Sequence, residues 1–577
     1  MSDSISLGTY LFARLNQKPL GLNSIFGVPG DFNLTLLDKI SEVKDLHWRG
    51  CTNELNAAYA CDGYSRVKGN GSAEGLGFGA LVTTFGVGEL SALNGVAGSY
   101  AEHVGMLHIV GIPSVDAQKN QLLLHHTLGN GDFSVFHKMS SHISGTTGVI
   151  NDPALAPDVI DRVIREAYIN QRPSYLAFPA NMVDVPVPKE RLNKPLDLNI
   201  PKNDPELQEE VIEEVIDKIR KAKDPVIIVD ACCARHNANK EASELIKISN
   251  FKYATTPMGK GTKDIDEQNP KFTGVYVGSL SYPHVKEAVE KSDLVLSVGA
   301  LLSDFNTGSF SYSIQTKNVV EFHSDYTKVK GATYPEIRMK ELLGKLIQSQ
   351  ALKQVFKEHP ISQTVKEPYN TDARNPGTKI TQQWLWSRLS KFLKPNDIVI
   401  TETGTSSFGI VQTSFPNQVY GISQILWGSI GYSVGCTYGA VTAAEELDPS
   451  RRVLLFVGDG SLQLTFTEIS SMVRNNRKPY LFVLNNNGYT IEKLIHGADA
   501  EYNAIQPWDL QLALPLFNAK NYENYKVSEA KELEELFTSK EFAKNDKIRF
   551  IEVMLEEMDA PENLVKQAEL SSKANSE

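Results

Sequence analysis

Two short segments in the last third of the chain carry the oxygen atoms that a magnesium ion needs. Gly458-Asp459-Gly460 follows one apolar run, and Asn485-Asn486-Asn487-Gly488 follows the next. A carboxylate, an amide oxygen and a backbone carbonyl suit Mg²⁺, which takes few carboxylates and usually also binds phosphate oxygens. Either motif alone is typical of a turn. Together, at the ends of consecutive strands, they predict Mg²⁺ bridging to a diphosphate.

A βαβ unit must position these segments. Residues 453–457 and 480–484 are unbroken apolar runs, which fit strands buried on both faces of a parallel sheet. Between them apolar side chains recur at helical spacing, at Leu462, Phe466, Ile469 and Val473. Adjacent parallel strands would bring Asp459 and Asn486 to one sheet edge. The helix would open at Gly460, where free N–H groups favour a phosphate.

The same alternation of apolar runs and helical patterns extends over the whole chain. The other expected strands are residues 80–85, 106–110, 175–178, 225–230, 294–298, 319–322 and 398–401. Such alternation favours parallel sheets with right-handed crossovers. Proline-rich stretches at 186–205 and 360–377 indicate linkers. We therefore expect an α/β fold of three domains, each a mainly parallel β-sheet flanked by helices, at residues 1–185, 206–359 and 378–577.

Composition and charge argue against several classes of partner. The chain has 577 residues, with 58 Lys and Arg against 69 Asp and Glu and a formal net charge of −11. This acidic balance argues against nucleic acid or an anionic membrane as the main partner. The 5 cysteines form no CxxC pair, which favours a reducing compartment over a disulfide framework. With no signal-peptide pattern and no apolar run of membrane-spanning length, we expect a cytoplasmic protein.

The first third of the chain holds groups with acid–base chemistry. Glu54 opens a helical run beside small residues, where burial would raise the pKa of its carboxyl group. A first-turn glutamate favoured by the helix dipole is the alternative. Asp31 ends a glycine turn, and His125 and His126 are adjacent. Neighbouring residues of a helix point to different faces, so the histidine pair alone does not indicate a metal site.

Gly458-Asp459-Gly460, followed after 24 residues by Asn485-Asn486, resembles the thiamine diphosphate signature of the decarboxylase and acetolactate synthase superfamily. The resemblance implies thiamine diphosphate and Mg²⁺ as cofactors, with Asp459, Asn486 and the Gly488 carbonyl as metal ligands. It implies that the cofactor is bound by Thr405, Gly428, Ser429, Ile430, Gly460, Ser461, Asn486, Asn487, Gly488, Tyr489, Thr490 and Ile491. Of these, Ile430 would bend the cofactor into a V shape. A glycine-rich helix-packing segment is the alternative around Gly428.

A second set of residues distinguishes the branches of this superfamily. Four residues match the pattern of the 2-keto-acid decarboxylases, namely Asp31, His125, His126 and Glu492. Acetolactate synthases lack the histidine pair. The resemblance implies that Glu54 hydrogen-bonds the pyrimidine ring of the cofactor and so activates its C2 carbon. It also implies that Asp31, His126 and Glu492 contact the substrate and, with His125, exchange protons with it.

The resemblance therefore implies a carboxy-lyase that converts a 2-keto acid to an aldehyde and carbon dioxide. Residues 84–91 and 422–428 closely resemble the fungal members that act on pyruvate in alcoholic fermentation, so we expect pyruvate as the substrate. A decarboxylase for a bulkier aromatic or branched keto acid shares every motif. A degenerate regulatory subunit would be expected to lack Glu54, Asp459 or Asn486. The family also implies a homodimer with shared sites, and its fungal members suggest a homotetramer.

Two features lie outside this pattern. Residues 70–80 carry spaced glycines that mimic part of a dinucleotide fingerprint, but they precede a strand, so we expect a flexible surface loop. Cys232 and Cys233 follow an expected strand, with Arg235 and His236 nearby. Positive charge there would lower a thiol pKa and suit a sensor of substrate activation. Two small residues packing a sheet are the alternative. We otherwise expect the middle domain to be a spacer.

Overall fold

The computed structural model describes residues 4–71, 75–361, 363 and 377–576. The chain forms two compact units, one from Met1–Ile200, Gly431–Ser450 and Thr465–Lys478, the other from Pro201–Ile430, Arg451–Leu464 and Pro479–Glu577. Of the three large sheets, two are wholly parallel and one is mostly parallel, which confirms the expected α/β class. The three domain boundaries stay a prediction.

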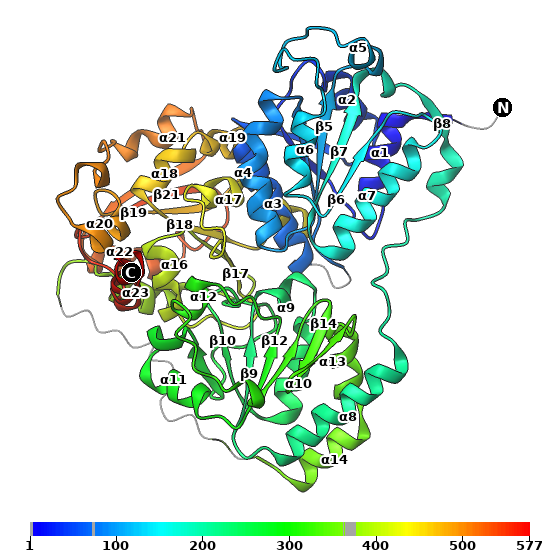
Figure 1. Ribbon diagram of the computed structural model, residues 1–577. Coiled ribbons are helices and arrows are strands. Elements are labelled where there is room, and N and C mark those ends of the chain that lie inside the picture. Colours follow the sequence, from blue (N-terminus) through cyan, green and yellow to red (C-terminus); the bar gives the residue numbers. More distant parts are fainter. Residues whose placement is uncertain (1–3, 72–74, 362, 364–376, 577) are drawn as a thin grey trace. The chain divides into compact units, whose positions relative to one another are not determined.

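The first unit contains a six-stranded parallel sheet. Its order is β3 (His47–Gly50), β2 (Ser24–Gly27), β4 (Gly79–Thr84), β5 (Met106–Ile112), β7 (Pro173–Pro179) and β6 (Thr146–Val149). Helices α1 (Leu7–Asn16) and α7 (Ala156–Asn170) lie together beside one face, and α3 (Glu54–Gly71) and α4 (Val87–Ala101) beside the other (Figure 1). Strands β4, β5 and β7 are therefore buried along their whole length, as their unbroken apolar runs predicted.

Helix α3 packs backbone to backbone against α17 (Tyr432–Leu447), which comes from a later part of the chain. A Cβ atom on Gly439 of α17 would lie 1.7 Å from a carbonyl oxygen of α3. One on Gly63 of α3 would lie 2.2 Å from a carbonyl oxygen of α17. Only glycine permits this approach. The contact fixes the axis of α3, whose first residue is Glu54.

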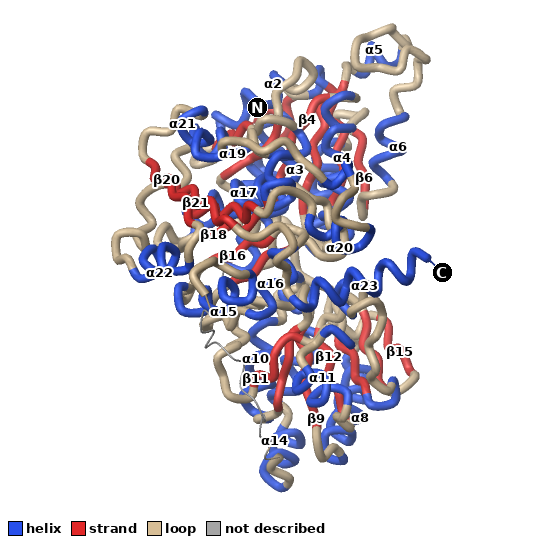
Figure 2. Tube along the Cα trace, turned by 90° about the vertical axis from the view of Figure 1, so that its left-hand side faces the viewer, coloured by secondary structure: helices blue, strands red, loops and turns tan. Residues whose placement is uncertain are grey.

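The second unit contains the other two large sheets. One has the order β11 (Phe272–Val275), β10 (Lys252–Thr255), β9 (Pro225–Val229), β12 (Leu294–Val298), β13 (Val319–Phe322), β14 (Tyr326–Val329) and β15 (Ala332–Pro335). The last two strands run antiparallel to their neighbours. Figure 2 shows strands of this sheet in red among blue helices, of which α8 (Pro205–Lys221) and α13 (Met339–Gln348) contribute to its core.

The remaining sheet positions the predicted metal ligands. Its order is β17 (Tyr420–Ser423), β16 (Ile398–Thr401), β18 (Val453–Gly458), β19 (Tyr480–Asn485), β21 (Ile548–Met554) and β20 (Tyr522–Val527). Strands β18 and β19 are parallel neighbours, so Asp459 and Asn486 leave the sheet at the same edge, as expected. The single helix expected between them is instead two short ones, α18 (Asp459–Thr465) and α19 (Glu468–Arg474).

Residues 75–80 are not the surface loop that we expected. Leu76 and Phe78 are buried there, with 8% and 1% of their surfaces exposed. A Cβ atom on Gly77 would lie 2.2 Å from a carbonyl oxygen of α3. The glycines therefore permit close approach to that helix, and they do not indicate flexibility. Residues 72–74 of the same segment lie outside the described part of the chain.

The first expected linker contains more structure than its prolines suggested. It begins with β8 (Pro186–Pro188), which pairs antiparallel with β1 (Ser4–Ser6) in a two-stranded sheet. Both strands of such a sheet are edge strands, so the missing N–H donor of proline is tolerated there. Residues 195–204 form no helix or strand. Most of the second linker lies outside the described residues. Within the described chain, none of the helices has both the length and the apolar character to cross a membrane.

We expect Gly77→Ala to lower the free energy of unfolding by about 1–3 kcal/mol, the usual cost of overpacking. Gly344→Ala is the control, because no atom lies within 4 Å of the Cβ position at Gly344 in α13. Alanine there should be neutral or stabilise the helix by up to about 1 kcal/mol. Thermal unfolding of both variants measures the difference. An unchanged melting temperature in Gly77→Ala would contradict the tight contact.

Candidate active site

Three polar groups converge where β18 and β19 end. The side-chain amide group of Asn486 lies 3.0 Å from Asp459 Oδ1 and 3.2 Å from the Gly488 carbonyl oxygen. Adjacent ligands of an octahedral Mg²⁺ ion are about 3 Å apart, so the spacing suits this metal. Without a cation, the amide nitrogen of Asn486 faces these two oxygens and donates to both. Rotation of the amide group would turn its oxygen toward a bound cation. The donor set therefore fits magnesium.

The surroundings of Asp459 explain why a cation is needed. The residue is 6% exposed, and burial raises the pKa of its carboxyl group to about 6. Backbone N–H groups offset part of this cost, from Gly460 to Oδ1 at 3.0 Å and from Gly488 to Oδ2 at 3.2 Å. A buried carboxylate without a positive partner is costly. Gly488 supplies both an N–H and a carbonyl because it turns sharply, with a φ of 119°.

An open cleft of about 280 Å³ adjoins these groups. Most of the expected cofactor-binding residues line it: Thr405, Gly428, Ile430, Gly460, Ser461, Asn486, Gly488, Tyr489, Thr490 and Ile491. Glu492, expected on the substrate side, lines it as well. Ser429 and Asn487 are not in the lining. The segment around Gly428 is a loop, so the helix-packing alternative is wrong.

Part of this lining is formed by residues that no sequence motif indicated. The additional residues are Phe305, Thr403, Gly404, Ser406, Gly458 and Ile495. Phe305 lies in α12 (Asp304–Thr307), after β12, and its ring meets Phe408 edge-on with 5.8 Å between centroids. The middle part of the chain is therefore more than a spacer. No sequence pattern pointed to Phe305, because it stands between residues typical of turns.

In the first unit the structure brings Asp31, His125 and His126 together. The Nε2 atom of His125 lies 2.7 Å from Asp31 Oδ2, and the two histidine ring centroids are 4.6 Å apart. The pair does not lie in a helix, contrary to our assumption. His126 has a φ of 62° in a turn, so the rings are not forced to opposite faces. The three side chains therefore form one acid–base cluster, in which Asp31 and His125 are exposed and His126 is partly buried.

Glu54 is half-buried at the start of α3. Burial raises the pKa of its carboxyl group, in the direction expected from the sequence, although a backbone hydrogen bond opposes the shift. Glu54 belongs to the same unit as Asp31 and the histidine pair, whereas Asp459 and Glu492 belong to the other unit. The expected proton-handling residues are therefore divided between the two units.

Comparisons with known proteins agree with this geometry. Three parts of thiamine pyrophosphate enzymes match the chain: the N-terminal TPP binding domain over residues 5–134, the central domain over 212–349 and the C-terminal TPP binding domain over 402–553. The pyruvate decarboxylases of Candida glabrata and Kluyveromyces lactis are 58% and 59% identical to it, over 99% of each chain. Pyruvate decarboxylase isozyme 3 of Saccharomyces cerevisiae is 59% identical over the same share. The chain belongs to the pyruvate decarboxylase family.

This membership confirms the resemblance and the expected carboxy-lyase class. It also gives the cleft a definite ligand class, because the matching family models describe thiamine pyrophosphate binding domains. Each family match lies within one of the three domains expected from the sequence.

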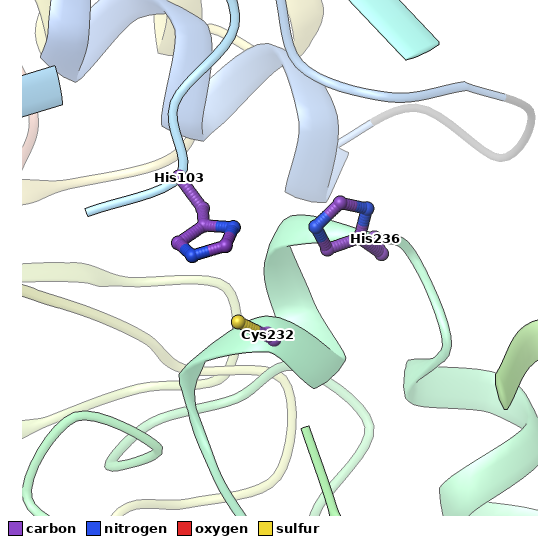
Figure 3. Close-up of side chains that lie close together, drawn as sticks. All are labelled: His103, Cys232 and His236. Carbon is purple, nitrogen blue, oxygen red and sulfur yellow. The ribbon is translucent and has the colours of Figure 1, made fainter. Parts of the chain in front are cut away.

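The thiols of the middle sheet differ from expectation. Cys232 and Cys233 lie in α9 (Ala231–Arg235), directly after β9, and Figure 3 shows Cys232 together with His236, which follows that helix. Both thiols are 0% exposed. Burial raises the pKa of the Cys233 thiol, opposite to the lowering that we expected from nearby positive charge. The burial of both thiols favours the packing alternative. A sensor role for Cys232 or Cys233 stays a prediction.

We expect Asp459→Ala to weaken Mg²⁺-dependent binding of thiamine diphosphate by at least about tenfold, because it removes the carboxylate from the predicted metal ligands. Isothermal titration of the cofactor into metal-loaded protein measures the effect. Asp509→Asn, an exposed acid outside the cleft lining, is the control and should bind as the parent does. Unchanged affinity in Asp459→Ala, or retained binding after exhaustive chelation, would contradict the metal assignment.

Proposed function

We propose that this chain decarboxylates pyruvate to acetaldehyde and carbon dioxide with thiamine diphosphate and Mg²⁺. The observation that carries the proposal is the convergence of the Asp459 carboxylate, the Asn486 amide group and the Gly488 carbonyl beside a cleft lined by the expected cofactor residues. Similarity to pyruvate decarboxylases over the full length supports the substrate. The intact cluster disfavours a degenerate regulatory subunit.

The residues of the cleft would bind and orient the cofactor. Asp459, Asn486 and the Gly488 carbonyl would hold Mg²⁺ against the diphosphate, and the backbone around Gly460 would donate to the phosphate oxygens. Ile430 is 36% exposed and offers an apolar surface to the rings. When bound, thiamine diphosphate would supply the nucleophilic carbon and the electron sink that decarboxylation of a keto acid needs.

The other predicted residues would handle protons. Burial raises the pKa of Glu54, which favours a protonated carboxyl group that hydrogen-bonds the pyrimidine ring. Asp31 and His125 are already within hydrogen-bonding distance, so they can hold one proton between them. With His126 and Glu492 they would orient the keto acid and deliver the proton that completes the aldehyde. We assign these transfers to the four residues as a set.

A panel of keto acids tests the substrate. With cofactor and Mg²⁺ present, pyruvate should give the highest kcat/KM, measured as carbon dioxide and aldehyde released in equal amounts. If an aromatic or branched keto acid gives a higher kcat/KM than pyruvate, that keto acid is the substrate instead. Formation of acetolactate as the main product would contradict the decarboxylase assignment.

Glu54→Gln should lower kcat by about 10²–10⁴-fold, the usual contribution of a general acid or base, because an amide cannot shuttle the proton. Deuterium exchange at C2 of the bound cofactor tests the same step directly and should slow in parallel. Asp158→Asn removes an exposed first-turn acid of α7 and should leave both rates unchanged. If C2 exchange is unchanged in Glu54→Gln, Glu54 does not activate the cofactor. Its interaction with the helix dipole would then be its only remaining role.

We also propose that the enzyme is at least a homodimer, and a tetramer by analogy with fungal members, with Glu54 and Asp459 of one site on different chains. Mixing inactive Glu54→Gln and Asp459→Ala proteins under conditions of subunit exchange should then restore about a quarter of the activity if chains pair at random. An active monomer in sedimentation would refute shared sites.

We further propose a cytoplasmic location, with neither membrane nor nucleic acid as partner.

A further inference from the structure

Glu89 is a buried carboxyl group without a role in the proposed function. It lies in the first turn of α4 and is 0% exposed. Its Oε1 atom accepts the backbone N–H of Gly86 at 2.9 Å, and its Oε2 atom accepts the hydroxyl group of Tyr175 on β7 at 3.0 Å. A glutamate at the third helical position often reaches back to the helix start in this way. Complete burial is unusual for a glutamate, which is almost never fully buried unless paired.

The turn that Glu89 holds touches two residues of the proposed proton machinery. Gly86 has a φ of 64°, and a Cβ atom there would lie 2.2 Å from the carbonyl oxygen of His126. A Cβ atom on Gly88 would lie 3.0 Å from Oε1 of Glu54. The segment from Gly86 to Gly88 therefore lies against the backbone of His126 and the side chain of Glu54. A shift of this turn would displace both.

The surroundings explain how the carboxyl group is kept in place. Burial raises the pKa of Glu89 to about 7, although the bonds from Gly86 and Tyr175 oppose the shift. On β5, His108 meets the Tyr175 ring edge-on, and burial lowers its pKa to about 3, so it supplies no positive charge. His137 of α6 (Val135–Ser141) stacks on the same tyrosine ring. The protonated and ionised forms of Glu89 both keep an oxygen that accepts the Gly86 N–H.

We propose that Glu89 is a positioning residue for the proton chemistry of the active site. It fixes the turn from Gly86 to Gly88, and through that turn it sets the Glu54 carboxyl group and the His126 backbone. The inference rests on the proposed roles of Glu54 and His126. It assigns Glu89 no contact with the cofactor or the substrate.

Removal and conservative replacement of the side chain test the proposal in the full-length enzyme with thiamine diphosphate and Mg²⁺. Glu89→Ala leaves the Gly86 N–H and the Tyr175 hydroxyl group unpaired. It should slow C2 deuterium exchange and lower kcat by about ten- to a hundredfold, the cost of a small misplacement. Glu89→Gln keeps the acceptor for Gly86 and can donate to Tyr175, so it should restore both rates to within about threefold of the parent.

Tyr10→Phe is the control for lost stability. It removes a buried hydroxyl group of α1 that donates to Asp161 at 2.8 Å in the same unit. It should lower the melting temperature without slowing exchange. If Glu89→Ala does not fold, Glu89→Asp takes its place, because the shorter side chain cannot reach both partners. Glu89→Asp should then slow deuterium exchange at C2 of the cofactor, whereas Glu89→Gln should not.

Parent-like exchange and kcat in Glu89→Ala or Glu89→Asp would overturn the proposal. Equal losses in Glu89→Gln and Glu89→Ala would overturn it as well, because position would then not be the property that matters. Glu54→Gln separates this result from a failure of the proposed function. If that variant also exchanges normally, the role of Glu54 is wrong. If it is slow while Glu89→Ala is normal, only the role of Glu89 is wrong.

Discussion

The first unit depends on the backbone contact between α3 and α17. A side chain larger than hydrogen at Gly63 or Gly439 would overlap a carbonyl group of the facing helix. The contact is reinforced by Asp62 of α3, which is 1% exposed and accepts hydrogen bonds from Tyr432 of α17 at 2.5 Å and Arg66 at 2.6 Å. Breaking such a buried pair costs about 3–5 kcal/mol. Glu54 owes its fixed position to this packing, because it is the first residue of α3.

The metal site depends on a different constraint, the register of two parallel strands. Gly458 lies opposite Leu484, so Asp459 and Asn486 leave the sheet together whatever their side chains are. The backbone therefore determines where the oxygens meet. The residue types determine only whether they bind a cation. This division explains why such a site can be retained on an α/β sheet while the surrounding loops vary.

Local features of the sequence predicted most of the fold and the metal site. The apolar runs became strands, and spacing alone placed Asp459 beside Asn486. Features that depend on distant partners could not be predicted. The turn at His126 requires a positive φ that no local pattern marks. Gly77 permits an approach to α3 that is visible only in three dimensions. Glu89 is buried by Tyr175, which is 86 residues away in the chain.

The first unit is built from segments that lie far apart in the chain, and this has a consequence for protein synthesis. Helix α3 ends at Gly71, but its partner α17 begins only at Tyr432. On the ribosome, at about 5–20 residues per second, the face of α3 that contains Gly63 remains uncovered for on the order of a minute before α17 is synthesised. During that time the nascent chain exposes a surface that the finished protein covers. A chaperone that shields residues 54–71 would protect the growing chain, and a message truncated before residue 432 would yield an aggregation-prone fragment.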